Sequence, residues 1–321
     1  MIDLEKEIIQ LTGAQSIKNT EVIQTLWSGY GMIKRYLLEG GKYPGLVVKH
    51  VDWSDQSNHP RGWNTSTSHQ RKLKSYQVEN CWYQEYSSLT TGQCKVPELF
   101  HYKAIKDGLL LIMEDLDHSG FDLRYNPETV QLDQVKCVLT WLANFHATFM
   151  HTSPDGLWDI GTYWHLDTRP DEWGDMRNKD LKAAASAIDQ RLQDSTFQTL
   201  VHGDAKLANF CFGQANQVAA VDFQYVGRGC GMKDVAYFLS SCFEEEECER
   251  YEDLLLGHYF EALKQALPSA FDFNSLEEEW RPLYAFAWAD FYRFLDGWSP
   301  GHWKMHGYSK RLTQGVIEQL E

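Results

Sequence analysis

The sequence lacks several patterns that would each have placed the protein in a definite class. No uninterrupted apolar run reaches the ~18 residues that a membrane-spanning helix needs. The seven cysteines are an odd number and widely spaced, with no C-x-x-C pair and no Cys/His cluster at zinc spacing. A disulfide framework and a structural zinc site are therefore disfavoured, and reduced thiols are expected. No internal repeat or low-complexity tract is found.

Basic residues are also scarce relative to acidic ones. The chain has 30 Lys and Arg against 45 Asp and Glu, a formal charge of −15. Such a charge disfavours nonspecific nucleic-acid binding through phosphates. It suits a cationic small substrate, but it equally suits solubility, so it decides little. The charged start of the chain does not resemble a signal peptide. We therefore expect a cytoplasmic protein with no membrane or nucleic-acid partner. The sequence does not indicate its oligomeric state.

The stretch VHGDAKLAN, followed after a short gap by AAVDFQ, carries most of the chemical information. Asp204 and Asn209 are five residues apart with Lys206 between them, and Asp222 follows Asn209 by thirteen, enough for a β-hairpin that brings both ends together. Phosphoryl transfer needs a carboxylate to orient the attacking hydroxyl and oxygen ligands for Mg²⁺. A lysine can offset charge on the transferring phosphate. The stretch therefore indicates a phosphotransferase site.

The order His-Gly-Asp-x-x-x-x-Asn, with a later strand ending in Asp, resembles the small-molecule kinases of protein-kinase-like fold. These include the aminoglycoside phosphotransferases, the choline kinases and the ecdysteroid kinase-like proteins. The resemblance extends from about residue 25 to about residue 240. It implies that Asp204 is the catalytic base and that Asn209 and Asp222 are the metal ligands, with Lys206 beside the γ-phosphate.

Two residues depart from the protein-kinase pattern. Gly203 stands where protein kinases have arginine, which argues against a protein kinase switched by activation-loop phosphorylation. Gln224 stands where they have the glycine of Asp-Phe-Gly, so the resemblance does not predict the backbone conformation after Asp222. A nucleotide-binding pseudokinase acting as an interaction module is the alternative. It would usually have lost Asp204, Asn209 or Asp222, and all three are present.

Residues 22–51 predict three antiparallel strands joined by two glycine-containing turns. In the kinases that this chain resembles, the first turn covers the nucleotide phosphates, which makes Gly29 and Gly31 candidates there. Lys49 lies at the end of an apolar strand, where a lysine needs an anionic partner. The α/β-phosphates of ATP would supply one, and a lysine that reaches solvent is the alternative. Residues 52–69 are expected to form a long loop, either a lid or disordered.

Residues 70–89 predict a helix from the spacing of their apolar residues. Glu79 and Glu85 are its candidates to pair with Lys49. The local pattern SYQVENCWY resembles the ecdysteroid kinase-like branch and favours Glu79, with an exposed surface glutamate as the alternative.

An apolar strand over 109–116 ends suddenly in Glu-Asp, as where these kinases cross from the small lobe to the large one. The resemblance implies that the Glu114 carbonyl and the Leu116 amide bind the adenine. It implies an α+β, two-lobed protein-kinase-like fold: a small antiparallel sheet with one helix in an N-lobe (1–116), a mainly helical C-lobe (117–321), and ATP in the cleft.

Within the expected C-lobe, helices are predicted over 129–150 and 179–193, and the irregular stretch 152–176 is placed to shape a substrate pocket. Asp234 resembles the family acid that braces the catalytic loop. Aromatic residues over 280–294, close to acids, predict either a cage for a cation or packed core. The resulting hypothesis is Mg²⁺-ATP-dependent phosphorylation of a hydroxyl group on a choline-like, aminoglycoside-like or steroid-like alcohol.

Overall fold

The computed structural model describes residues 4–26, 29–53 and 66–321. The chain divides into two compact units, Met1–Ser88 with Val96–Asp122 and Leu89–Lys95 with Leu123–Glu321. The first contains an antiparallel sheet and the second is mainly helical, which confirms the α+β class. The predicted lobes, 1–116 and 117–321, differ from these units in two places. Residues 117–122 stay with the first unit, and Leu89–Lys95 packs with the second.

The sheet of the first unit has five strands in the order β1-β2-β3-β5-β4, each antiparallel to its neighbours. The strands are β1 (Ser16–Thr25), β2 (Gly31–Glu39), β3 (Gly45–Asp52), β4 (Leu99–Ile105) and β5 (Gly108–Glu114). In the register of the central strand β3, Lys49 lies opposite Ile33 of β2 and Leu111 of β5. Because successive strand residues point to opposite faces, Lys49 faces away from the side that Val48 occupies.

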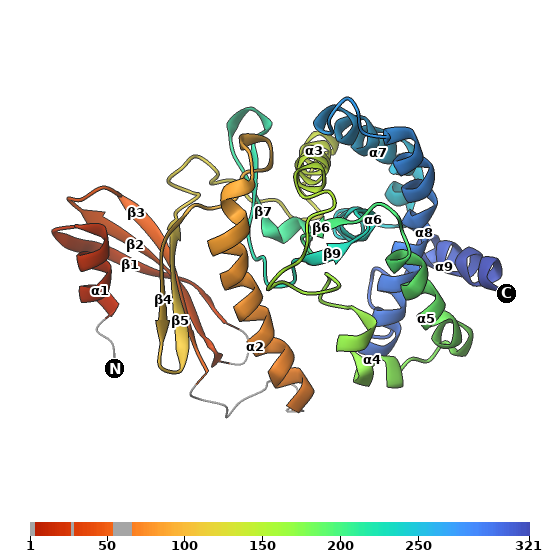
Figure 1. Ribbon diagram of the computed structural model, residues 1–321, viewed down its shortest axis with the longest axis horizontal. Helices are drawn as coiled ribbons and strands as arrows, with labels where there is room; N and C mark the ends of the chain where they lie inside the picture. Colours follow the sequence, from red (N-terminus) through yellow and green to blue (C-terminus); the bar gives the residue numbers. More distant parts are fainter. Residues whose placement is uncertain (1–3, 27–28, 54–65) are drawn as a thin grey trace. The chain divides into compact units, whose positions relative to one another are not determined.

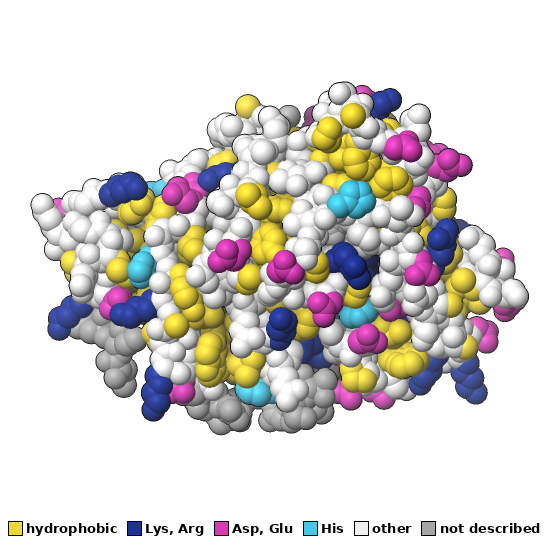
Figure 2. All heavy atoms as spheres, viewed as in Figure 1, with side chains coloured by type: hydrophobic (Ala, Val, Ile, Leu, Met, Phe, Trp, Pro, Cys, Tyr) yellow, Lys and Arg dark blue, Asp and Glu magenta, His cyan; other side chains and the backbone are white. Residues whose placement is uncertain are grey.

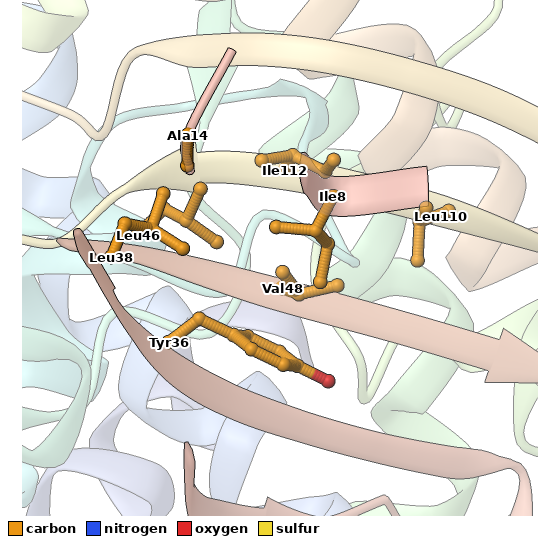
Figure 3. Packing of buried hydrophobic residues seen from close by; sticks show 8 residues of the cluster. All are labelled: Ile8, Ala14, Tyr36, Leu38, Leu46, Val48, Leu110 and Ile112. Atoms are coloured by element: carbon orange, nitrogen blue, oxygen red, sulfur yellow. The ribbon is translucent and has the colours of Figure 1, made fainter. Parts of the chain in front are cut away.

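The Val48 face of the sheet packs against α1 (Leu4–Thr12). Figure 3 shows Ile8 of this helix among side chains from β2, β3 and β5. The buried cluster consists of Ile8, Ala14, Tyr36, Leu38, Leu46, Val48, Leu110 and Ile112. The helix ends at Thr12 and is followed by Gly13, whose φ of +67° is the left-handed conformation common after a helix C-terminus. This core fixes β3, and with it the position of Lys49.

The helix α2 (Ser66–Cys81) supplies the partner of Lys49 and begins earlier than the predicted start at residue 70. Residues 66–69 had been assigned to a loop because they are polar, yet Ser and Thr are also common where helices start. The helix continues as a π-turn (Trp82–Tyr86) and a 3-10 turn (Ser87–Leu89). Residues 54–65 of the long loop expected over 52–69, either a lid or disordered, lie outside the described residues.

The second unit is built on α3 (Leu132–Thr148), which packs against α7 (Glu245–Ala266), and on α8 (Phe273–Trp298), which contacts several other helices. Figure 1 shows α3 beside α7. The other α-helices are α4 (Pro170–Gly174), α5 (Lys179–Gln193), α6 (Met232–Ser240) and α9 (Gly307–Leu320). Short 3-10 turns lie at Gly92–Cys94, Leu166–Thr168, Leu207–Asn209 and Gln214–Asn216.

Two short strand pairs complete this unit and hold its catalytic loop. The strand β6 (Thr199–Val201) pairs with β9 (Gly227–Gly229), and β7 (Phe210–Phe212) pairs with β8 (Val218–Ala220). The β7–β8 hairpin is the one that the spacing between Asn209 and Asp222 predicted. The loop between β6 and β7 and the residues after β8 are therefore brought together.

None of the helices in the described ranges is long and apolar enough to cross a membrane. In the same part of the chain, no disulfide joins the seven cysteines. On the face drawn in Figure 2, acidic and basic side chains of the described residues are interspersed.

Candidate active site

The loop after β6 is held in shape by His202, which is fully buried. Its Nδ1 accepts a hydrogen bond from the Asp204 backbone N–H (3.2 Å), so the ring proton lies on Nε2. Nε2 donates to the carbonyl of Val221 at 3.0 Å. His202 thus ties the catalytic loop to the residue that precedes Asp222.

The carboxylate of Asp204 is the centre of the site. Its Oδ2 accepts hydrogen bonds from Lys206 Nζ (2.9 Å) and Asn209 Nδ2 (3.1 Å), and its Oδ1 accepts one from the Tyr237 hydroxyl (3.1 Å). Burial alone lowers the pKa of Lys206, but Asp204 and Asp222 outweigh it, and the net shift of that pKa is upward. Lys206 is therefore a cation at neutral pH. The structure brings Asp204, Lys206 and Asn209 together, with Asp222 close enough to act on the same lysine.

Asp222 lies two residues after the end of β8 and has a left-handed backbone with a φ of 69°. This conformation costs a non-glycine residue roughly 1 kcal/mol or more. The side chain of Gln224 donates to Asp222 Oδ1 at 2.7 Å, and Val221 N–H donates to the Asn209 carbonyl at 2.9 Å. The chain therefore does not need a glycine at position 224, because the left-handed turn falls on Asp222 itself. Gln224 instead orients the carboxylate of Asp222.

Asp234, at the start of α6, braces the loop as the resemblance implied. It is fully buried, and its two oxygens accept hydrogen bonds from the backbone N–H groups of His202 (2.6 Å) and Gly203 (3.0 Å). His146 of α3 also contacts it at 3.1 Å. Gly203 has a φ of +78°, and a Cβ there would lie 2.1 Å from the Tyr225 carbonyl oxygen. The backbone therefore requires glycine where protein kinases have arginine.

In the first unit, Lys49 forms a buried ion pair with Glu79. The Nζ–Oε2 distance is 2.6 Å, and the two side chains are 3% and 4% exposed. The alternative of a lysine reaching solvent is wrong, because the side chain is enclosed. Glu85, the other candidate partner, is exposed.

The remaining predicted nucleotide contacts lie in the same unit. Gly31 has a φ of +122°, and a Cβ there would lie 2.0 Å from the His50 carbonyl oxygen, so glycine lets β2 approach β3. Gly29 has a φ of +78°, and nothing lies within 4 Å of where its Cβ would be. Glu114 ends β5, where its N–H donates to the Glu98 carbonyl, and the carbonyl of the buried Leu116 accepts from the Ser119 and Phe121 N–H groups. Their roles toward a nucleotide stay predictions.

A pocket of about 310 Å³ opens beside Asp204 within the second unit. This volume lies at the lower end of the range for ligand sites, roughly 300–1,000 Å³. Its ionisable side chains besides tyrosine are Asp204, Lys206, His302 and Lys304, and its other walls are Tyr163, Tyr225, Tyr237, Phe291, Leu295 and Trp298. Tyr163 comes from the irregular stretch that was expected to shape a pocket. Asp204 thus faces an aromatic cavity of ligand size.

The sequence did not reveal Lys304 and His302, which lie between α8 and α9. The Ser-Pro-Gly at 299–301 was the available signal, since such a cluster marks a turn. Of the two interpretations of the aromatic residues over 280–294, a cation cage or packed core, the partners of the nearby acids do not support the cage. Asp290 accepts from Trp164 and pairs with Arg293, and Asp296 accepts from two backbone N–H groups.

Solved structures of other proteins share the fold of this chain. The chain is similar to amicoumacin kinase hAmiN, solved in complex with AMP-PNP, Ca²⁺ and Ami, with a TM-score of 0.57, 12% identity, and coverage of 99% of this chain and 93% of that one. It is also similar to choline kinase LicA from Streptococcus pneumoniae, with a TM-score of 0.51, 13% identity and 99% coverage of both chains. These likenesses show the protein-kinase-like fold. Among curated protein sequences, none matches.

The family comparison is more direct. Residues 70–154 and 166–270, together more than half of the chain, match the ecdysteroid kinase-like family. The matched ranges contain Glu79, the catalytic loop and the brace at Asp234. The chain belongs to the ecdysteroid kinase-like family.

Proposed function

We propose that this protein transfers the γ-phosphoryl group of Mg²⁺-ATP to a hydroxyl group of a small molecule. The observation that carries the proposal is Asp204, a carboxylate held by three donors on the wall of a ligand-sized aromatic pocket. Kinases acting on small molecules are named among the family and the structures that the chain is similar to.

Asp204 orients the acceptor hydroxyl and takes its proton. Of its two oxygens, Oδ2 accepts from Lys206 and Asn209, whereas Oδ1 accepts only the Tyr237 hydroxyl among the described residues. A carboxylate oxygen can accept more than one hydrogen bond, so Oδ1 has capacity for a hydroxyl in the pocket. As the acceptor oxygen bonds to the γ-phosphorus, ADP leaves and the proton moves to Asp204. Positioning and electrostatics supply most of the rate in such reactions.

Asn209 and Asp222 fit the role of Mg²⁺ ligands. Mg²⁺ prefers oxygen donors, usually one or two carboxylates completed by phosphates and water. The described residues contain no cluster of three or more His, Cys, Asp or Glu side chains arranged for a metal, so a site dependent on phosphate oxygens suits this chain better than an all-protein cage. Asn209 uses its amide nitrogen on Asp204, which leaves its oxygen for a metal. Bound Mg²⁺ would neutralise phosphate charge, and Lys206 would add to that effect.

Residues of the first unit are proposed to bind the nucleotide. Lys49, fixed by Glu79, is proposed to bind the α/β-phosphates, and the turn with Gly29 and Gly31 to approach them through its backbone. The Glu114 carbonyl and the Leu116 amide are proposed to bind the adenine. The buried Lys49–Glu79 pair supports this assignment, because a buried lysine held by one carboxylate is oriented for a second anion.

The acceptor class is open among choline-like, aminoglycoside-like and steroid-like alcohols. The formal charge of −15 suits a cation, but charges far from the pocket are screened by salt. We expect the reaction to take place in the cytoplasm.

A screen of ATP turnover against a library of small alcohols tests the proposal, with phosphorylated products identified by mass spectrometry. Turnover of at least one alcohol by the wild type and its loss in Asp204→Asn is the expected result. Nucleotide binding without turnover of any alcohol would instead favour the pseudokinase alternative.

A further inference from the structure

Among the described residues, no carboxylate forms an ion pair with the buried lysine of this pocket. Lys304 lies between α8 and α9, is 8% exposed, and lines the same pocket as Asp204. Its Nζ donates to the Ser240 hydroxyl at 3.3 Å, and the residues that the structure describes give it no ion pair. A buried ammonium whose hydrogen-bond acceptor among the described residues is a hydroxyl and not a carboxylate is costly, so an anion entering the pocket would gain a strong interaction.

Aromatic rings surround this ammonium. Lys304 Nζ lies 4.7 Å from the ring centroid of Tyr237, 5.3 Å from that of Phe291 and 5.5 Å from that of Trp303. Such an arrangement of rings is what binds a ligand cation in other proteins. Here the protein's own lysine fills it, so a cationic headgroup at this wall would meet a like charge.

The other charged groups of the pocket do not neutralise the positive charge of Lys304. Asp204 is already bound by Lys206, and also accepts from Asn209 and Tyr237. Burial, helped by Lys304, lowers the pKa of His302, so this imidazole is neutral at pH 7. The wall formed by Lys304 therefore carries a local positive charge, although the whole chain is acidic. At physiological salt, charges beyond about 8 Å on the surface are largely screened, so the local charge decides.

We propose that the acceptor is an anionic alcohol: a hydroxyl group on a compact apolar or aromatic skeleton that also carries a carboxylate or similar anion, bound by Lys304. The inference rests on the proposed function, since it names the acceptor class of the same pocket. The hydroxyl faces Asp204, the skeleton packs against Phe291 and Trp298, and the anion meets the ammonium. An acceptor with a cationic headgroup against Lys304 is excluded by the same geometry.

Direct binding without nucleotide tests this inference separately from catalysis. Matched probes share one skeleton, for example 3-(hydroxymethyl)benzoate, its primary amide and 3-(aminomethyl)benzyl alcohol, and several such triplets are measured by calorimetry or ligand-observed NMR. Over the set, the acid should bind about tenfold or more tighter than its amide, because a hydrogen bond to a charged group is strong, and the amine should bind weakest. Equal binding of the three members, or preference for the amine, overturns the proposal.

Variants of Lys304 test whether this residue causes the preference for the acid over its amide. In Lys304→Gln, and in Lys304→Met as a second variant should the first not fold, the acid-over-amide ratio should fall to near one. The matched control Lys310→Gln changes an exposed lysine on α9 and should keep the wild-type ratio. A wild-type ratio retained in a folded Lys304 variant overturns the proposal. If instead the ratio falls as expected but no alcohol is phosphorylated, the proposed function fails and the anion site stands.

Discussion

At the residue scale, the buried Lys49–Glu79 pair leads to a specific prediction about nucleotide binding. Lys49→Ala leaves Glu79 buried without its cation, which should cost about 3–5 kcal/mol of unfolding free energy. In protein that remains folded, the KM for ATP should rise and kcat should fall, while acceptor binding changes little. Lys49→Arg should restore only part of the activity, because a planar guanidinium does not replace a compact ammonium.

Denaturant unfolding and steady-state kinetics measure both effects of the Lys49 changes. The double variant Lys49→Met with Glu79→Met is the control, since it removes both charges and should recover much of the stability without recovering ATP affinity. Wild-type ATP kinetics in Lys49→Ala would leave the pair with a structural role alone.

The proposed metal ligands differ in charge, and their variants should differ accordingly. Asp222→Ala should abolish Mg²⁺-dependent nucleotide binding, and Asn209→Ala should weaken it less, because a carboxylate attracts Mg²⁺ more strongly than an amide does. Calorimetry with and without Mg²⁺ separates the two. Unchanged Mg²⁺-ATP affinity in Asp222→Ala would remove that residue from the site.

Lys304 predicts a pH dependence for the binding of an anionic acceptor. Burial lowers the pKa of Lys304 to about 8, although Cys242 and Asp204 act in the opposite direction. The titratable groups that face it are Asp204, Lys206, Tyr237, Cys242 and His302. As the pH rises through about 8, the ammonium loses its proton, so the affinity for a carboxylate probe should fall by up to roughly tenfold per pH unit.

Titration calorimetry from pH 6.5 to pH 9.5 checks this dependence, with the amide probe as the reference. The amide should show a much flatter profile, and Lys304→Gln should flatten that of the acid. An acid affinity that stays constant across the range in the wild type would contradict the role of the lysine.

At the scale of elements, helices and hairpins with strong local signals were predictable. The helix α5 has the predicted bounds, and the β7–β8 hairpin followed from the spacing of Asn209 and Asp222. The start of α2 was missed because its first turn is polar and reads as a loop. The segment that carries Lys304 was also missed. Its position depends on packing against Tyr237 and Phe291, which are distant in sequence.

The brace between α6 and the catalytic loop gives a prediction at this scale. Asp234→Ala leaves the buried backbone N–H groups of His202 and Gly203 without an acceptor, which should cost about 2–5 kcal/mol of unfolding free energy. It should also lower kcat more than it raises the KM for ATP, because the loop that carries Asp204 loses its support. Denaturant unfolding and kinetics measure the two effects. The matched control Asp253→Ala, at an exposed acid on α7, should change neither. A wild-type kcat in Asp234→Ala would show that the hydrogen bonds from the loop to Asp234 are not needed for catalysis.

At the scale of the whole molecule, the sequence indicated the family and the chemical centre but not the acceptor. The proposed catalytic residues lie within a short stretch, so their order and spacing were visible in the sequence. The pocket walls come from six separate segments, around Tyr163, Asp204, Tyr225, Tyr237, Phe291 and Lys304, which come together only in the fold. The overall charge decided little about the acceptor, because it suits a cationic substrate and solubility equally, whereas the buried lysine of the pocket favours an anion.

The central claim is that Asp204 makes this fold a phosphotransferase, and one comparison tests it most directly. Phosphoryl transfer from ATP to an accepted alcohol is measured for the wild type and Asp204→Asn, with Mg²⁺-ATP affinity measured on the same samples. The account predicts that the variant loses turnover by about a hundredfold or more while its ATP affinity stays within a few fold, because an interaction made only in the transition state is removed. Turnover close to that of the wild type in Asp204→Asn, with ATP still bound, would contradict it.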